Sequence, residues 1–93
     1  MPNIEVYGKE KKDQQEVINA IYAIFLHNFP EKFDDVVITF VNSGVYDLFG
    51  SKKPFVRVYH TNLEEAKQIA KVLSAYMDAE VMLLTAFFEN SKA

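Results

Sequence analysis

The stretch Val36-Val-Ile-Thr-Phe-Val41 and the later stretch Phe55-Val-Arg-Val-Tyr59 decide the fold of this chain. β-branched and aromatic residues dominate both stretches, which is typical of β-strands. Because successive side chains of a strand point to opposite faces of its sheet, one face of the first stretch carries Val36, Ile38 and Phe40 and the other carries Val37, Thr39 and Val41. Neither face is polar. We therefore expect the chain's own helices to cover one face of this sheet and something else to cover the second.

Length and composition predict a single domain spanning residues 1–93. A chain of 93 residues buries enough surface for one core, and a composition of 49% hydrophobic and 25% charged residues is typical of an ordered chain. The net charge is -3 and the only arginine is Arg57. Since nucleic-acid binding usually needs a basic stripe, we expect no nucleic-acid partner. The absence of cysteine excludes disulfides and thiolate metal sites.

The sequence shows no signal for export or for membrane insertion. The N-terminal segment Met1-Pro-Asn-Ile-Glu-Val6 lacks the charged-then-apolar pattern of a signal peptide. No apolar run approaches the roughly 20 residues that are needed to span a bilayer. We therefore expect a cytoplasmic protein without a membrane partner.

The hydrophobic pattern predicts secondary structure in the order β-α-β-β-α-β. Helical spacing of apolar residues and alternation of apolar and polar residues separate the two kinds of element. The predicted elements are a strand at about 3–7, a helix at about 13–28, strands at 36–41 and 55–60, a second helix, and a last strand at about 80–88.

Capping residues mark where each helix begins. Asp13 is the expected N-cap of the first helix. For the second helix, either Thr61 with Glu64 or Asn62 with Glu65 fits the spacing of a capping box. The sequence does not choose between these two pairs.

The element order predicts a two-layer α/β (α+β) sandwich, with a four-stranded mixed sheet and both helices on one face. Right-handed β-α-β crossovers place both helices on the same side. Two strand orders fit: a ferredoxin-like split β-α-β fold, or two β-α-β units side by side. In either case the second face of the sheet is apolar, and monomers rarely expose such patches. We therefore expect a homo-oligomer whose sheets pack against one another.

The segment 42–54 is expected to form a long loop or a hairpin, with a bulge at Gly44 and a turn at Gly50-Ser-Lys-Lys53. Its end is too apolar for an ordinary solvent-exposed loop. We expect it to pack on its own core, on a neighbouring subunit or on a ligand. The apolar residues in question are Val45, Tyr46, Leu48 and Phe49.

Pro2 is the first candidate for a catalytic residue. Initiator methionine is generally removed before a small residue, and its removal would leave Pro2 as an N-terminal secondary amine. An α-amino group has a pKa of about 8, which burial lowers towards neutrality. Such an amine can transfer protons next to a carbonyl group. The structural alternative is that proline simply begins an edge strand, where a missing N–H is tolerated.

The order of these segments resembles the tautomerase superfamily, which includes the 4-oxalocrotonate tautomerase and macrophage migration inhibitory factor families. Met1-Pro-Asn-Ile-Glu-Val6, then a helix, then Asp35-Val-Val-Ile-Thr-Phe40 resembles the start of that superfamily. Phe49-Gly-Ser-Lys-Lys-Pro54 followed by a strand looks like the middle of the migration-inhibitory-factor type. Pro54-Phe-Val-Arg-Val58 and Phe87-Phe-Glu-Asn90 are similar to an uncharacterised tautomerase-like bacterial group.

This resemblance implies a duplicated β-α-β fold and trimers whose sheets pack inside. It also implies that the amino-terminal proline, Pro2 here, is the catalytic base, and that no cofactor takes part. A small-molecule ligand is then expected. A retained Met1 would make Pro2 an amide and would remove its basicity.

Four further residues are candidates for the site. Arg57 could bind a carboxylate or enolate through its fixed fork of donors, or it could form an intersubunit ion pair with an acid such as Glu5 or Glu80. His60 could be an acid–base or substrate-binding group, or a capping histidine. Tyr46 and Tyr59 could line a substrate pocket. We expect no metal site, because neither histidine has a carboxylate at a familiar metal-ligand spacing.

Two hypotheses of function follow. The first is a small tautomerase-like isomerase that performs 1,3-proton transfer on a keto/enol acid, with Pro2 as base and Arg57 as its partner. The second is a non-catalytic domain that oligomerises through its sheet and binds a partner through the 42–54 segment. The state of Met1 discriminates between them.

Overall fold

The computed structural model describes residues 2–31 and 35–83, and it confirms the predicted β-α-β-β-α-β order. Its elements are β1 (Asn3–Tyr7), the short 3-10 helix η1 (Lys11–Asp13), α1 (Gln14–Asn28), β2 (Val37–Val41), β3 (Phe55–His60), α2 (Leu63–Leu73) and β4 (Asp78–Leu83). The last strand begins two residues earlier than predicted, and the rest of its predicted range, 84–88, lies outside the described residues. No described helix is long and apolar enough to cross a membrane.

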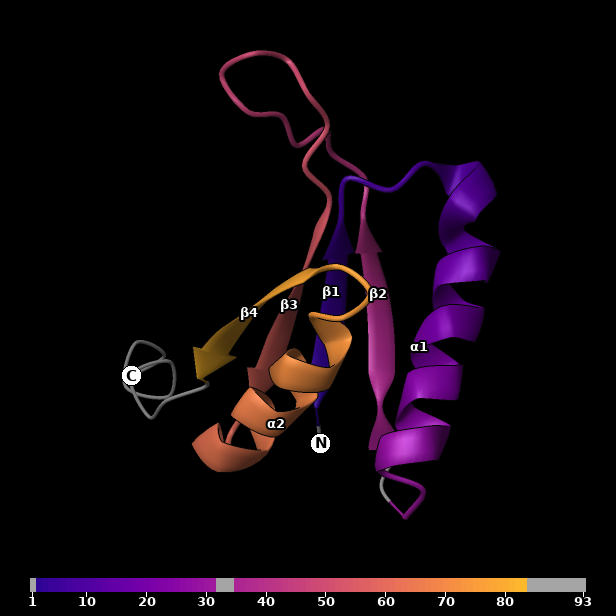
Figure 1. Ribbon diagram of the computed structural model, residues 1–93, viewed down its shortest axis with the longest axis vertical. Coiled ribbons are helices and arrows are strands. Elements are labelled where there is room, and N and C mark those ends of the chain that lie inside the picture. Colours follow the sequence, from indigo (N-terminus) through magenta and orange to yellow (C-terminus); the bar gives the residue numbers. More distant parts are fainter. Residues whose placement is uncertain (1, 32–34, 84–93) are drawn as a thin grey trace, which may run out of the picture.

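The strand order decides between the two folds that the sequence allows. The sheet runs β2-β1-β3-β4 (Figure 1), with β1 parallel to β2, β3 parallel to β4, and β1 antiparallel to β3. In a split β-α-β fold another strand lies between the two parallel strands, whereas here they are direct neighbours. The structure therefore consists of two β-α-β units side by side, joined through β1 and β3.

One face of the sheet and both helices enclose the core. Side chains alternate along the central strands, so Ile4 and Val6 of β1 and Val56 and Val58 of β3 are buried. Helix α1 runs beside β2, and α2 packs on the half of the sheet formed by β3 and β4 (Figure 1). The helices add Val17, Ile21, Phe25, Ala66, Ile69, Ala70 and Leu73 to the same cluster. Spacing of three and four residues puts these side chains on one face of each helix.

Only one of the two expected helix caps is made as predicted. Asp13 makes no side-chain cap, because it ends η1 with helical backbone angles (φ -96°, ψ -5°) and lacks the extended conformation of a capping residue. At α2 the Oδ1 of Asn62 accepts a hydrogen bond from the backbone N–H of Glu65, at 3.0 Å. The Asn62–Glu65 pair is therefore the one that begins α2.

The second face of the sheet is left partly uncovered in the single chain. Val37 is 42% exposed and Met82 is 41% exposed. Tyr7, Phe55 and Tyr59 on this face are half-buried. This arrangement agrees with the expectation that the chain's own helices cover only one face.

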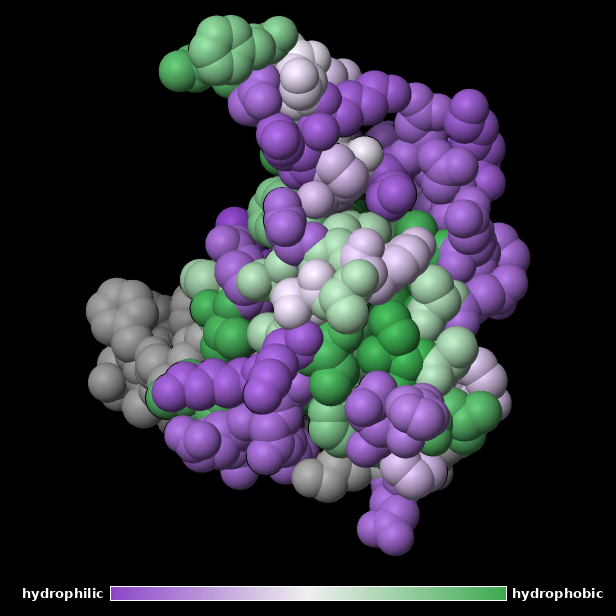
Figure 2. Space-filling model, in the orientation of Figure 1, coloured by the Kyte–Doolittle hydropathy of each residue, from purple (hydrophilic) through white to green (hydrophobic). Residues whose placement is uncertain are grey.

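The segment 42–54 forms a hairpin that projects beyond the sheet, and its end is apolar (Figures 1 and 2). The predicted turn at 50–53 is wrong: the turn lies at 47–50, because Oδ1 of Asp47 accepts hydrogen bonds from the backbone N–H groups of Phe49 and Ser51. Gly50 completes the turn with a φ of 83°, a value that favours glycine. This turn presents Leu48 and Phe49 to solvent at 101% and 94% exposure.

Candidate active site

Pro2 lies buried immediately before β1. Its carbonyl accepts a hydrogen bond from the backbone N–H of Val37, at 3.2 Å. This bond ties the entry to β1 onto the start of β2. Pro2 is thus anchored to the sheet through its carbonyl, although proline cannot itself donate to the sheet.

His60 lies at the corresponding end of β3. Its side chain is only 6% exposed, and its Nε2 is 3.0 Å from Oε1 of Glu65 on α2. A carboxylate only accepts hydrogen bonds, so Nε2 carries the hydrogen in this pair. Among the residues that the structure describes, the buried Nδ1 of His60 has no hydrogen-bond partner.

The sheet register brings Pro2 and His60 together. Asn3 pairs with Tyr59 and Ile4 with Val58 in the antiparallel β1–β3 ladder. Continuing this register by one residue places Pro2 opposite His60. The Pro2 carbonyl points towards β2, so Pro2 and His60 form no backbone hydrogen bond with each other. In antiparallel sheets the side chains of such non-hydrogen-bonded pairs approach most closely.

Arg57 and Tyr59 lie on the other face of the sheet, away from Pro2, and Arg57 is already paired. The guanidinium donates from Nε to the carboxylate of Glu80 and from Nη1 to the hydroxyl of Tyr7, the latter at 3.5 Å. The hydrogen bond to Glu80 raises the pKa of Arg57 above its ordinary value. The ion pair with Glu80 thus forms within the single chain.

Aromatic rings surround this guanidinium. It lies 5.0 Å from the ring centroid of Tyr7 and 5.3 Å from that of Phe55, and these two rings stack at 4.7 Å. The Tyr7 hydroxyl donates to Oε1 of Glu5 at 2.5 Å, and this bond, together with burial, raises the pKa of Tyr7 to about 12. The cluster is a polar and aromatic patch on the uncovered face of the sheet.

Tyr46 lies far from Pro2 in the single chain. It pairs with Lys52 in the 42–54 hairpin, which extends from the end of the sheet opposite to the N-terminus (Figure 1). Its side chain is 59% exposed. Of the predicted site residues, the structure therefore brings Pro2 and His60 together and places Arg57, Tyr59 and Tyr46 elsewhere.

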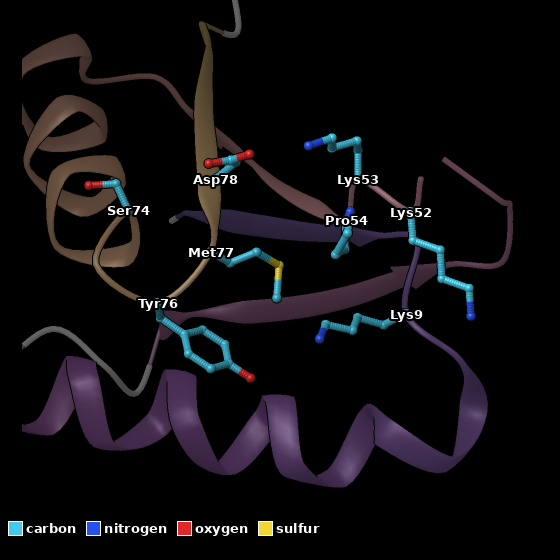
Figure 3. Close-up of a pocket in the computed structure, with 8 residues that line it drawn as sticks. All are labelled: Lys9, Lys52, Lys53, Pro54, Ser74, Tyr76, Met77 and Asp78. Carbon is cyan, nitrogen blue, oxygen red and sulfur yellow. The ribbon is translucent and has the colours of Figure 1, made fainter. Parts of the chain in front are cut away.

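A cleft that the sequence did not indicate lies at the hairpin end of the sheet (Figure 3). Its volume is about 360 Å3, and its lining includes Lys9, Lys52, Lys53 and Tyr76. Lys52 pairs with Glu10 at 3.0 Å and Lys53 with Asp47 at 3.9 Å. The described residues contain no cluster of acidic or histidine side chains that could hold a metal ion. Since the three lysines come from two segments far apart in sequence, no local pattern could have predicted them.

The fold and the buried proline define a class: a two-layer sandwich of two β-α-β units with a proline at the start of its first strand. The sequence matches no protein-family profile and no curated protein. Solved structures do match, and three of them are described below.

A protein of unknown function from Vibrio cholerae O1 biovar eltor matches with a TM-score of 0.63 and 12% identity, over 90% of this chain and 78% of that one. A domain of unknown function, DUF1904, from Sebaldella termitidis matches with a TM-score of 0.60 and 15% identity, over 95% and 93% of the two chains. A macrophage migration inhibitory factor-like protein from Entamoeba histolytica matches with a TM-score of 0.60 and 12% identity, over 91% and 90%. At these identities the similarity shows the fold, and it confirms the predicted tautomerase-like fold.

Proposed function

We propose that this protein catalyses a 1,3-proton transfer on a small keto/enol acid, with Pro2 as the base. The observation that supports this proposal is the burial of Pro2 at the start of β1, opposite the buried His60. The similarity in fold to a migration inhibitory factor-like protein is consistent with it.

The reaction requires that Met1 is removed, so that Pro2 has a free secondary amine. Burial disfavours the charged form of an amine, so a share of Pro2 is the free base near neutral pH. The amine takes a proton from the carbon next to the substrate carbonyl, and the C–H electron pair becomes the C=C bond of an enolate. The protonated amine then returns the proton to the other end of the three-atom system, and Pro2 is regenerated.

Arg57 is proposed to bind the carboxylate or the enolate of the substrate, and Tyr46, Tyr59 and His60 to line the pocket. Within one chain Arg57 and Tyr59 lie on the opposite face of the sheet from Pro2, and Tyr46 lies beyond its far end. These three residues therefore reach a bound substrate only across a subunit boundary. The proposed roles of Arg57, Tyr59 and Tyr46 thus depend on an oligomer.

We also propose a homo-oligomer, with a trimer favoured, in which the partly uncovered sheet faces pack inside. The exposure of Val37 and Met82 on that face, together with the half-buried rings of Tyr7 and Phe55, supports this assembly. Apolar groups on such a surface gain about 25 cal/mol for each Å2 removed from water.

Mass spectrometry of the protein made in its native host tests the proposal, first denatured and then native. The denatured mass shows whether one methionine has been lost, and the native mass gives the number of subunits. Turnover is then measured with a panel of small 2-oxo acids, by the ultraviolet absorbance of their enols. The variant Pro2→Ala replaces the cyclic amine and should lose most of the activity. Pro30→Ala, at an exposed turn position, is the matched control and should retain it.

The second candidate function is a non-catalytic binding domain. It is favoured by the hairpin end, where a well-ordered turn holds Leu48 and Phe49 fully in solvent. A retained Met1 would make Pro2 an amide and contradict the tautomerase mechanism. In that case the hairpin and the sheet face would be the binding surfaces to examine.

A further inference from the structure

The imidazole of His60 is a buried group with one satisfied and one unsatisfied nitrogen. Its side chain is 6% exposed, Nε2 is bonded to Glu65, and Nδ1 has no partner among the described residues. Buried polar atoms without a partner are rare, because their lost hydration is not replaced by a hydrogen bond. The position of Nδ1 therefore requires a donor or acceptor that the described residues do not supply.

Glu65 determines which kind of partner Nδ1 needs. The carboxylate of Glu65 accepts the hydrogen of Nε2, so a neutral His60 has no hydrogen on Nδ1, and this nitrogen is an acceptor. Glu65 is itself held in place, since its backbone N–H donates to Oδ1 of the N-cap residue Asn62 at 3.0 Å. In the tautomer that carries its hydrogen on Nε2, the missing partner of Nδ1 is therefore a hydrogen-bond donor.

Removal of Met1 would create such a donor next to His60. While Met1 is attached, the nitrogen of Pro2 is an amide without hydrogen. Once Met1 is removed, the same nitrogen carries one hydrogen as an amine and two as an ammonium. The β1–β3 register, continued by one residue, places Pro2 opposite His60 in the closely spaced type of pair, with both residues buried.

We propose that Nδ1 of His60 accepts a hydrogen bond from the amine of Pro2 after Met1 has been removed, so that Glu65, His60 and Pro2 form one hydrogen-bonded chain. This inference rests on the proposed removal of Met1, and it deepens the proposed role of Pro2. His60 is then a positioning residue. It orients the amine, and with Glu65 behind it stabilises the ammonium that forms when Pro2 takes a proton from substrate.

The chain contains only two histidines, which makes a direct test possible. The protein is labelled with 15N at histidine and prepared in two forms, one with Met1 removed and one with Met1 retained by inhibiting methionine aminopeptidase during expression. Nitrogen spectra of the two forms are compared. The Nδ1 resonance of His60 should shift between the two forms. The resonances of His27, which is exposed on α1, should not move and serve as the internal control.

Two variants on α2 separate the contribution of Glu65 from a general effect of charge. Glu65→Gln should move the His60 resonances and lower kcat at least tenfold with little change in KM. Glu64→Gln, whose side chain is 82% exposed, removes the same charge one residue away and should do neither. The His27 resonances of both variants also report whether the fold is kept.

An Nδ1 resonance of His60 that is identical in the two forms would overturn the inference. If the protein shows turnover but its His60 spectra are unchanged, Pro2 remains the base and only the hydrogen bond from Pro2 to His60 is refuted. A shifted His60 resonance without turnover would keep the hydrogen bond and refute the proposed reaction. The two proposals therefore fail independently.

Discussion

Replacing Ile4 with alanine tests the assignment of the buried face of the sheet. Ile4 is fully buried and lies between Ile38 on β2 and Val58 on β3. The substitution removes three carbon atoms at about 0.8 kcal/mol each, or roughly 2.4 kcal/mol. The cavity left behind raises the expected loss in free energy of unfolding to about 3–4 kcal/mol.

Urea unfolding followed by far-UV circular dichroism measures this loss. With a dependence on urea of about 1–3 kcal/mol per M, the midpoint should fall by roughly 1–4 M. The matched control is Val37→Ala, on the opposite face and 42% exposed, which should cost at most about 1 kcal/mol in an isolated chain. A loss below about 1 kcal/mol for Ile4→Ala would refute the reasoning. A Val37→Ala loss that depends on protein concentration would instead indicate that an oligomer covers this face.

Three further predictions concern a cap, a turn and a tyrosine. Asn62→Ala removes the cap on the Glu65 N–H and should lower the free energy of unfolding by about 1 kcal/mol. Asn62→Asp keeps a capping oxygen and should leave the stability unchanged. Thermal unfolding of both variants measures the difference. Replacing Leu48 and Phe49 with serine should leave stability nearly unchanged, because both are exposed; a change in native mass would show that they contact another subunit. The pKa of Tyr7 is raised from 10.0 to about 12 by its bond to Glu5, so the fold favours the neutral phenol. This contribution to stability is present below pH 10 and is lost as the pH rises towards 12. Urea unfolding across this pH range should show that the parent protein loses this stability and that Tyr7→Phe does not.

The order of helices and strands was predictable because it rests on local hydrophobic spacing. The strand order was not, since β-α-β-β-α-β fits two arrangements and only the pairing of β1 with β3 separates them. The position of the hairpin turn was missed for another reason. Gly50 and the lysines after it suggested a turn at 50–53, but the side chain of Asp47 bonds two backbone N–H groups and fixes the turn earlier.

The candidate site was predictable residue by residue but not as an arrangement. Pro2 and His60 each have chemistry that the sequence shows, yet their adjacency depends on a register between strands far apart in the chain. From the sequence, Glu65 was recognised only as part of a helix start. Its bond to His60 depends on the direction in which α2 leaves β3, which the sequence does not give. A histidine at the end of a strand followed five residues later by a glutamate in the first turn of a helix is the signal that could have suggested it.

The two β-α-β units are related by a pseudo-twofold axis that passes between Glu5 and Arg57, which pair at the centre of the β1–β3 ladder. This axis exchanges β1 with β3, and with them Pro2 and Pro54, each of which directly precedes its strand. The two prolines lie at opposite ends of the sheet, one beside the buried His60 and the other in the lysine-lined cleft. In the proposed mechanism only Pro2 becomes a free amine, because Pro54 keeps an amide bond on both sides. The pseudo-twofold arrangement thus contains two equivalent positions, of which the proposed removal of Met1 turns only one into a base.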